Sequence, residues 1–159
     1  MAFQHADDPA WQPLVDAAWQ ARSCAHAPYS GFKVGAALRT TSGETIAGCN
    51  VENASYPMCT CAERTAVCAA VARGLKDGGL MALVVVTEAE TLTPPCGACR
   101  QVLAEFAEDL PILLVNRGGR AQHRLKALLP EAFTGRNFLP PAHGFPPPAA
   151  PGGPIQGDS

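Results

Sequence analysis

The sequence predicts an α/β fold in which helices cover both faces of a five-stranded mixed sheet. Patterns of helix and strand follow one another in the order helix, hairpin, helix, strand, helix, strand, strand, and such alternation packs helices against a central sheet. Residues 80–87 and 112–115 are apolar runs without strict alternation, which is typical of strands buried on both faces. We therefore expect three layers, α/β/α.

The first helix is expected over residues 11–25, with a hairpin after it. An Asp-Pro pair at positions 8–9 suits a helix start. Small or apolar residues then recur near helical spacing: Leu14, Val15, Ala18, Ala21 and Ala25. Two extended segments, residues 34–39 and 45–50, flank a turn at 41–43, which predicts an antiparallel hairpin.

A second helix is expected to begin at Thr60. Glu63 stands three residues further on, and this spacing is that of a capping box, in which the two side chains close the helix N-terminus. The helix should run to about Arg73, because Gly74 provides a stop. A capping role alone is therefore one possible interpretation of Glu63.

Two more helices and two more strands are expected in the second half of the chain. A helix over residues 97–107 places its apolar residues on one side. After the strand at 112–115, a Gly-Gly turn at 117–120 predicts a short return strand near 121–124. A short helical piece over residues 125–129 precedes a proline.

The length of 159 residues fits one domain that buries its own core. From residue 140 the composition changes abruptly to proline and glycine clusters with almost no charge. Such a segment has too little apolar surface to order itself. We expect a catalytic domain over residues 1–139 and a disordered tail over 140–159.

Composition excludes several classes of protein. The net charge is −2 and the 12 Lys and Arg residues are spread along the chain, whereas a nucleic-acid groove normally shows a basic stripe. Residues 1–8 lack the basic start and apolar core of a secretory signal, and the apolar run at 80–86 is too short to cross a bilayer. We expect a cytoplasmic protein that binds neither nucleic acid nor membrane.

Seven cysteines, an odd number, do not suggest a disulfide framework, and a reducing compartment suits them. Cys96 and Cys99 are one helical turn apart, so their sulfur atoms can face the same point. Cys61 is the best third ligand, because a carboxylate two residues further on, Glu63, can move protons at a catalytic zinc site. The remaining cysteines outside this region, Cys24, Cys49 and Cys68, are expected to be small buried hydrophobic residues.

Two alternatives to a catalytic site come from the same cysteines. If Cys59 joined the other three thiolates, zinc would be closed by four ligands and the site would be structural. Alternatively, Cys96 and Cys99 alone could form a redox pair, although the Cys-Ala-Glu element at 61–63 argues against it.

Three longer strings carry a resemblance to a known family. They are Cys-Asn-Val-Glu-Asn at 49–53, Cys-Ala-Glu-Arg-Thr-Ala at 61–66 and Pro-Cys-Gly-Ala-Cys-Arg-Gln at 95–101. In this order they resemble the homotetrameric type of cytidine deaminase, and the likeness extends from about residue 27 to 133. The resemblance implies a cytidine deaminase-like fold, one Zn²⁺ per chain, and hydrolysis of cytidine and 2'-deoxycytidine to uridine and 2'-deoxyuridine in pyrimidine salvage. Deaminases of the antibiotic blasticidin S share much of the zinc string and are the alternative within this class.

The resemblance also implies roles for individual residues. Glu63 would move the protons of the reaction, and Arg64 would hydrogen-bond the zinc thiolates. Asn50 and Glu52 would bind the ribose 3'-hydroxyl, and Phe32 would pack on the pyrimidine ring. Ala62 would touch the substrate. Ala54, Tyr56 and Phe133 would reach a neighbouring subunit's site in a homotetramer. Gln101 would brace the substrate loop.

Overall fold

The computed structural model describes residues 2–135 and contains the predicted mixed sheet. The proposed tail at 140–159 lies outside these residues. The strands are β1 (Gly35–Thr40), β2 (Thr45–Cys49), β3 (Leu80–Val86), β4 (Pro111–Val115) and β5 (Arg120–Arg124). Their order in the sheet is β2-β1-β3-β4-β5. Only β3 and β4 run parallel, and the other neighbouring pairs are antiparallel.

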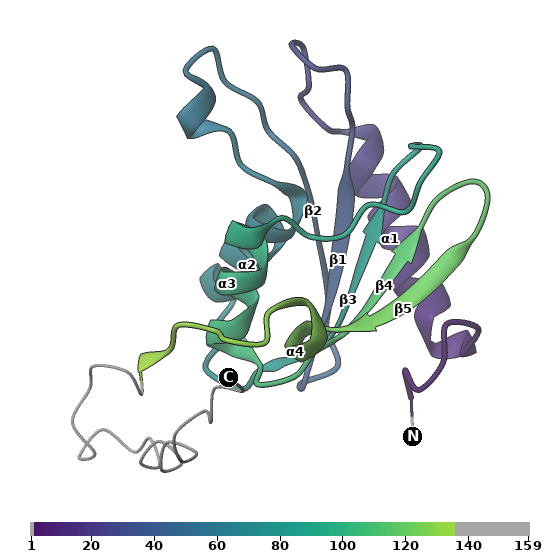
Figure 1. Ribbon diagram of the computed structural model, residues 1–159, viewed down its shortest axis with the longest axis vertical. Coiled ribbons are helices and arrows are strands. Elements are labelled where there is room, and N and C mark those ends of the chain that lie inside the picture. Colours follow the sequence, from purple (N-terminus) through teal and green to yellow (C-terminus); the bar gives the residue numbers. More distant parts are fainter. Residues whose placement is uncertain (1, 136–159) are drawn as a thin grey trace, which may run out of the picture.

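Helices cover both faces of this sheet, so the predicted three layers are confirmed (Figure 1). On one face, α1 (Gln12–Ser23) follows the short helix η1 (Pro9–Trp11); on the other lie α2 (Ala62–Ala72), α3 (Gly97–Phe106) and α4 (Leu125–Leu128). The β3 side chains alternate between the two cores: Val84 and Val86 pack with α1, and Leu83 and Val85 pack with α2 and α3. In the described part of the chain, none of the helices combines the length and apolar character needed to span a membrane.

The predicted capping box at Thr60 is wrong. Helix α2 begins at Ala62 with Cys61 as the N-cap residue, and no side chain caps it. Thr60 instead pairs with Val51 through two backbone hydrogen bonds of 2.9 Å. This long-range pairing keeps Thr60 in extended backbone, and it releases Glu63 from the capping role that local spacing suggested.

Two connections extend beyond the same end of the sheet, where α2 begins (Figure 1). One joins α1 to β1, and the other joins β2 to α2 and contains the short helix η2 (Tyr56–Met58). A parallel bridge between His26 and Val51 ties them together. Helix α2 lies close against β2: a Cβ on Gly48 would lie 2.5 Å from the Ala66 backbone nitrogen.

Candidate active site

Three thiol groups meet where α2 and α3 begin. The sulfur atoms of Cys61, Cys96 and Cys99 all lie within 4.8 Å of one another. Cys61 and Cys96 are 3.9 Å apart, and Cys96 and Cys99 are 3.4 Å apart. Zinc–sulfur bonds of about 2.3 Å in a tetrahedron place sulfur atoms roughly 3.8 Å apart. The three thiols therefore fit one zinc ion and leave its fourth position to another ligand.

The fourth cysteine of this region does not join the group. The Cys59 sulfur instead faces the backbone of Asn53, accepting from its nitrogen at 3.3 Å and lying 3.7 Å from its oxygen. The group of metal-ligating side chains found in residues 2–135 contains only Cys61, Cys96 and Cys99. This arrangement disfavours the closed, structural zinc site.

Arg64 lies against these thiols and compensates their charge. Its Nη2 donates to the Cys59 carbonyl oxygen at 3.1 Å and lies 3.9 Å from the Cys61 sulfur. Hydrogen bonding from Cys99, together with Arg64 and Cys96, lowers the pKa of Cys61 to about 5. The pKa of Cys99 is raised by its hydrogen bond to Cys61 and by burial. The lowered pKa favours the thiolate of Cys61, and a thiolate is the form that binds zinc.

Glu63 is a buried carboxyl group in the first turn of α2, with only 4% of its surface exposed. Burial raises the pKa of Glu63, and the negative charge of nearby Cys61 raises it further. A buried carboxyl with a raised pKa beside metal-ligating thiols is the kind of group that serves as a general acid and base.

Asn50 and Glu52 hold the connection between α1 and β1. The Asn50 side chain accepts from the Val34 nitrogen and donates to the Phe32 oxygen, both at 2.8 Å. The Asn50 Nδ2 group carries a second N–H, which neither of these two hydrogen bonds uses. Asn50 can therefore support this connection and still donate to a ligand.

The carboxylate of Glu52 accepts hydrogen bonds from two residues that were not predicted from the sequence to contact it. Its Oε2 accepts from the backbone nitrogens of Tyr29 at 2.9 Å and Ser30 at 3.2 Å, and its Oε1 accepts from the Ser30 hydroxyl. The Ser30 hydroxyl, then Tyr29, lowers the pKa of Glu52, so the carboxylate stays ionised. A carboxylate oxygen has two lone pairs, which leaves Oε1 one more acceptor position. The only sequence feature that pointed to this contact was the predicted turn at residues 28–31, whose exposed backbone nitrogens need a hydrogen-bond acceptor.

The aromatic residues named by the resemblance are exposed. Phe32, Tyr56 and Phe133 expose 43%, 68% and 62% of their surface. A cavity of about 290 Å³ is lined by Tyr29, Ser30, Glu52, Tyr56 and Cys59. Ala62 is fully buried and Ala54 is exposed. Gln101 contacts the backbone of Phe133 rather than the zinc thiols.

Arg100 is a further residue whose contacts were not predicted from the sequence. Its side chain donates to the Pro95 carbonyl oxygen at 2.7 Å and to the Leu128 carbonyl oxygen at 2.8 Å. These bonds fix the loop directly before Cys96 to the end of α4. The position of Cys96 is therefore set partly by a contact that no local spacing predicts.

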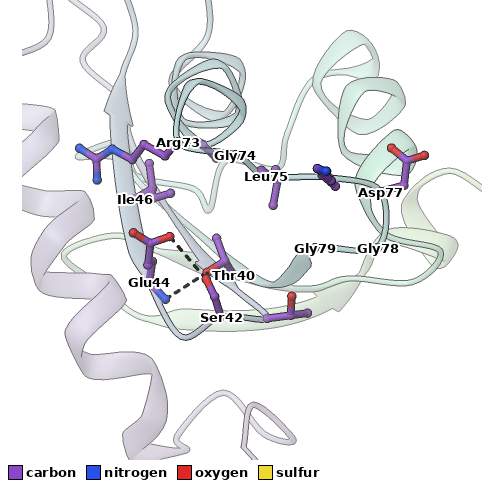
Figure 2. A pocket seen from close by; sticks show the side chains of 13 residues that line it. Thr40, Ser42, Glu44, Ile46, Arg73, Gly74, Leu75, Asp77, Gly78 and Gly79 are labelled. Carbon is purple, nitrogen blue, oxygen red and sulfur yellow. Dashed lines mark hydrogen bonds between the residues drawn. The ribbon is translucent and has the colours of Figure 1, made fainter.

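A cavity of about 490 Å³ at the other end of α2 has a different character. Figure 2 shows Thr40, Ser42 and Glu44 pointing toward one another in it. The two hydroxyl oxygens are 2.8 Å apart, and the Glu44 nitrogen donates to Thr40 Oγ1 at 3.0 Å. These polar groups brace the turn between β1 and β2, and the cavity brings together neither the thiols nor Glu63.

Comparison with known proteins gives a consistent picture. The family model for the cytidine and deoxycytidylate deaminase zinc-binding region matches residues 11–113. Cytidine deaminase of Halalkalibacterium halodurans is 46% identical over 129 residues, which cover 80% of this chain and 96% of that protein. A crystal structure of cytidine deaminase from Burkholderia pseudomallei has a TM-score of 0.73 and 50% identity, covering 76% of this chain and 97% of the other. Blasticidin-S deaminase of Bacillus cereus is 31% identical over 107 residues, 64% of this chain and 76% of that protein.

Proposed function

The chain belongs to the family of cytidine and deoxycytidylate deaminases, and from this membership we propose that it converts cytidine and 2'-deoxycytidine to uridine and 2'-deoxyuridine by zinc-dependent hydrolysis, with release of ammonia. The observation that carries the proposal is a buried carboxyl, Glu63, beside three converging thiols. Relatives named cytidine deaminase match this chain at higher identity and over more of its length than blasticidin-S deaminase does. The antibiotic is therefore the less favoured substrate.

In this proposal Cys61, Cys96 and Cys99 hold zinc, which supplies the Lewis-acid chemistry that makes water nucleophilic near neutral pH. Glu63 moves the protons. It takes one from the attacking water and gives it to N3 of the pyrimidine ring, then takes the second and gives it to the amino group that leaves from C4. One water is consumed, one ammonia is released, and Glu63 returns to its starting state. The raised pKa of Glu63 suits a group that both accepts and donates a proton.

Substrate recognition is assigned to the two connections above the sheet. Asn50 and Glu52 each retain one unused hydrogen-bonding position, a donor and an acceptor. A hydroxyl group needs one of each, so the pair suits the ribose 3'-hydroxyl. Phe32 is assigned to the pyrimidine ring, Ala62 to a further substrate contact, and Ala54 to the substrate in a neighbouring subunit's site.

We also propose a homotetramer in which Tyr56 and Phe133 complete a neighbouring subunit's site. Both side chains are large, apolar and exposed in the single chain, which is the composition expected of an interface. The catalytic domain would span residues 1–139, and the protein would act in the cytoplasm in pyrimidine salvage. Removal of residues 140–159 should leave assembly unchanged on size-exclusion chromatography.

The decisive experiment is a spectrophotometric deamination assay of the zinc-loaded protein. Cytidine, 2'-deoxycytidine, dCMP, cytosine and blasticidin S are compared under one set of conditions. The proposal expects the two nucleosides to give the highest kcat/KM. Higher kcat/KM for blasticidin S would move the substrate assignment to the antibiotic, and no turnover of any substrate by protein with one zinc per chain would contradict the enzymatic function.

A further inference from the structure

Cys24 and Cys49 differ from the buried residues expected from the sequence. Cys24 is exposed and Cys49 is partly buried, and both are free thiols. Cys68, the third cysteine expected to be buried, is also exposed, on α2. The zinc site uses none of the three. The surroundings of Cys24 and Cys49, however, bring these two close to each other.

A backbone bridge joins the two segments that carry these cysteines. His26 and Val51 form a parallel bridge: the His26 nitrogen donates to the Asn50 oxygen at 3.1 Å, and the Glu52 nitrogen donates to the His26 oxygen at 2.8 Å. Cys24 and Cys49 each stand two residues before a member of this bridge. Disulfides join Cα atoms that are roughly 4.4–6.8 Å apart, and this bridge holds the two segments side by side within two residues of each cysteine.

The side chain of Cys49 also faces α1. Cys49 pairs with Gly35 in the antiparallel β1–β2 ladder, and directly paired residues share one face of a sheet. A Cβ on Gly35 would lie 2.0 Å from the Ala18 oxygen and 2.8 Å from the Arg22 Cβ. This face is therefore covered by the last turns of α1, and Cys24 is the C-cap residue of that helix.

The two thiols also interact electrostatically. Burial raises the pKa of Cys49, and the charge of Cys24 raises it further. Because nucleophilic attack needs the thiolate, the raised pKa and partial burial of Cys49 make it a poor first attacking group. Exposed Cys24 is the thiol that an oxidant in solution meets first.

We propose that Cys24 and Cys49 form an oxidisable thiol pair, which a small disulfide such as oxidised glutathione closes into an intramolecular disulfide. The Cys24 thiolate attacks one sulfur of glutathione disulfide, and the first glutathione leaves as a thiol. The Cys49 thiolate then attacks the Cys24 sulfur and displaces the second glutathione. The protein loses two electrons and two protons, and one glutathione disulfide is reduced to two thiols.

Closure of this pair would act on substrate binding. The new bond would join the end of α1 to the residue directly before Asn50, and Glu52 lies three residues further on. This part of the inference rests on the proposed ribose contacts of those two residues. Weakening one such hydrogen bond raises KM by about fivefold, whereas kcat should change little because Glu63 lies on another element.

The experiment equilibrates the full-length, zinc-saturated protein with oxidised and reduced glutathione at several ratios. Digestion with trypsin and an endoproteinase specific for glutamate yields the peptides 23–33 and 45–52, each with one cysteine. Mass spectrometry should find the two peptides joined, with the loss of two hydrogen atoms. Cys24→Ser should abolish this product, and the matched variant Cys68→Ser, which removes an exposed cysteine outside the pair, should retain it.

The cross-link and the activity give separate readouts. Absence of the joined peptides at ratios where Cys68 already carries glutathione would overturn the pair. A cross-link that leaves the KM for cytidine unchanged would overturn its effect on substrate binding. Because mass spectrometry scores the cross-link without any turnover, failure of the deaminase proposal would remain distinguishable from failure of this one.

Discussion

Gln101 and Phe133 exchange two hydrogen bonds: Gln101 Nε2 donates to the Phe133 oxygen at 2.5 Å, and the Phe133 nitrogen donates to Gln101 Oε1 at 3.2 Å. Gln101 stands on α3 two residues after Cys99. The helix that carries two of the zinc thiols at its start therefore also positions the segment that presents the Phe133 ring.

Gln101→Ala should raise the KM for cytidine with little change in kcat, because it releases the Phe133 backbone without touching a thiol or Glu63. Loss of the paired hydrogen bonds corresponds to roughly a 5- to 10-fold increase. Steady-state kinetics check this against Gln20→Ala, a change at an exposed position of α1. A fall in kcat at constant KM would argue that Gln101 acts on the zinc site instead.

Glu63→Gln should keep the fold and one zinc per chain but lose turnover by about 100- to 10,000-fold, the usual contribution of a general acid–base group. The amide keeps the size of the side chain and removes its proton transfer. The matched control is Glu105→Gln, an exposed glutamate on α3, which should behave as wild type. Turnover of Glu63→Gln within threefold of wild type would refute the assignment.

Cys59→Ser should retain one zinc per chain, because the Cys59 sulfur faces Asn53 and not the thiol group. Cys61→Ser, Cys96→Ser and Cys99→Ser should each bind zinc more weakly, since zinc favours thiolates over hydroxyl oxygen. Metal analysis after dialysis against a mild chelator separates the two outcomes. Zinc loss from the Cys59 variant equal to that of the other three would mean that Cys59 is a ligand.

The wild-type protein should discriminate between cytidine and 3'-deoxycytidine but not between cytidine and 2'-deoxycytidine. A hydrogen bond to a charged group contributes about 1.5–3 kcal/mol, or roughly 10- to 150-fold in kcat/KM. Glu52→Ala should reduce that discrimination, because both substrates then lack the same contact. Equal kcat/KM for cytidine and 3'-deoxycytidine in the wild type would show that Asn50 and Glu52 only brace the neighbouring backbone.

If Phe133 completes a neighbouring subunit's site, two defective variants should restore one another. Glu63→Gln and Phe133→Ala subunits are unfolded together, refolded and reassembled. Sites that take Glu63 from one variant and Phe133 from the other are then intact. The mixture should show a low-KM component that neither variant has alone. Activity equal to the average of the separate variants would indicate that each chain builds its site by itself.

The parts of this protein that were predictable from the sequence are those with local causes. The apolar sequences of β3 and β4 are explained by burial on both faces of the sheet alone. The approach of Cys96 to Cys99 follows from their spacing of one helical turn. The Thr60 capping box failed because backbone pairing with Val51, nine residues earlier, outweighed the side-chain capping preference. The contact of Glu52 with Ser30 was missed for the same reason, since it joins two loops 22 residues apart.

The origin of the three thiols couples the candidate metal site to the completed sheet. Cys61 and Cys96 are 35 positions apart, and the segment between them contains all of α2 and β3. The complete ligand set exists only after β3 has taken its place in the sheet and both helix starts have been brought together. Zinc held by these thiols would tie the two segments together in the folded chain, and its binding free energy would add to the free energy of unfolding. A newly made chain would thus bind zinc with all three thiols only once its sheet is complete. Loss of the ion would remove a link between residues 35 positions apart.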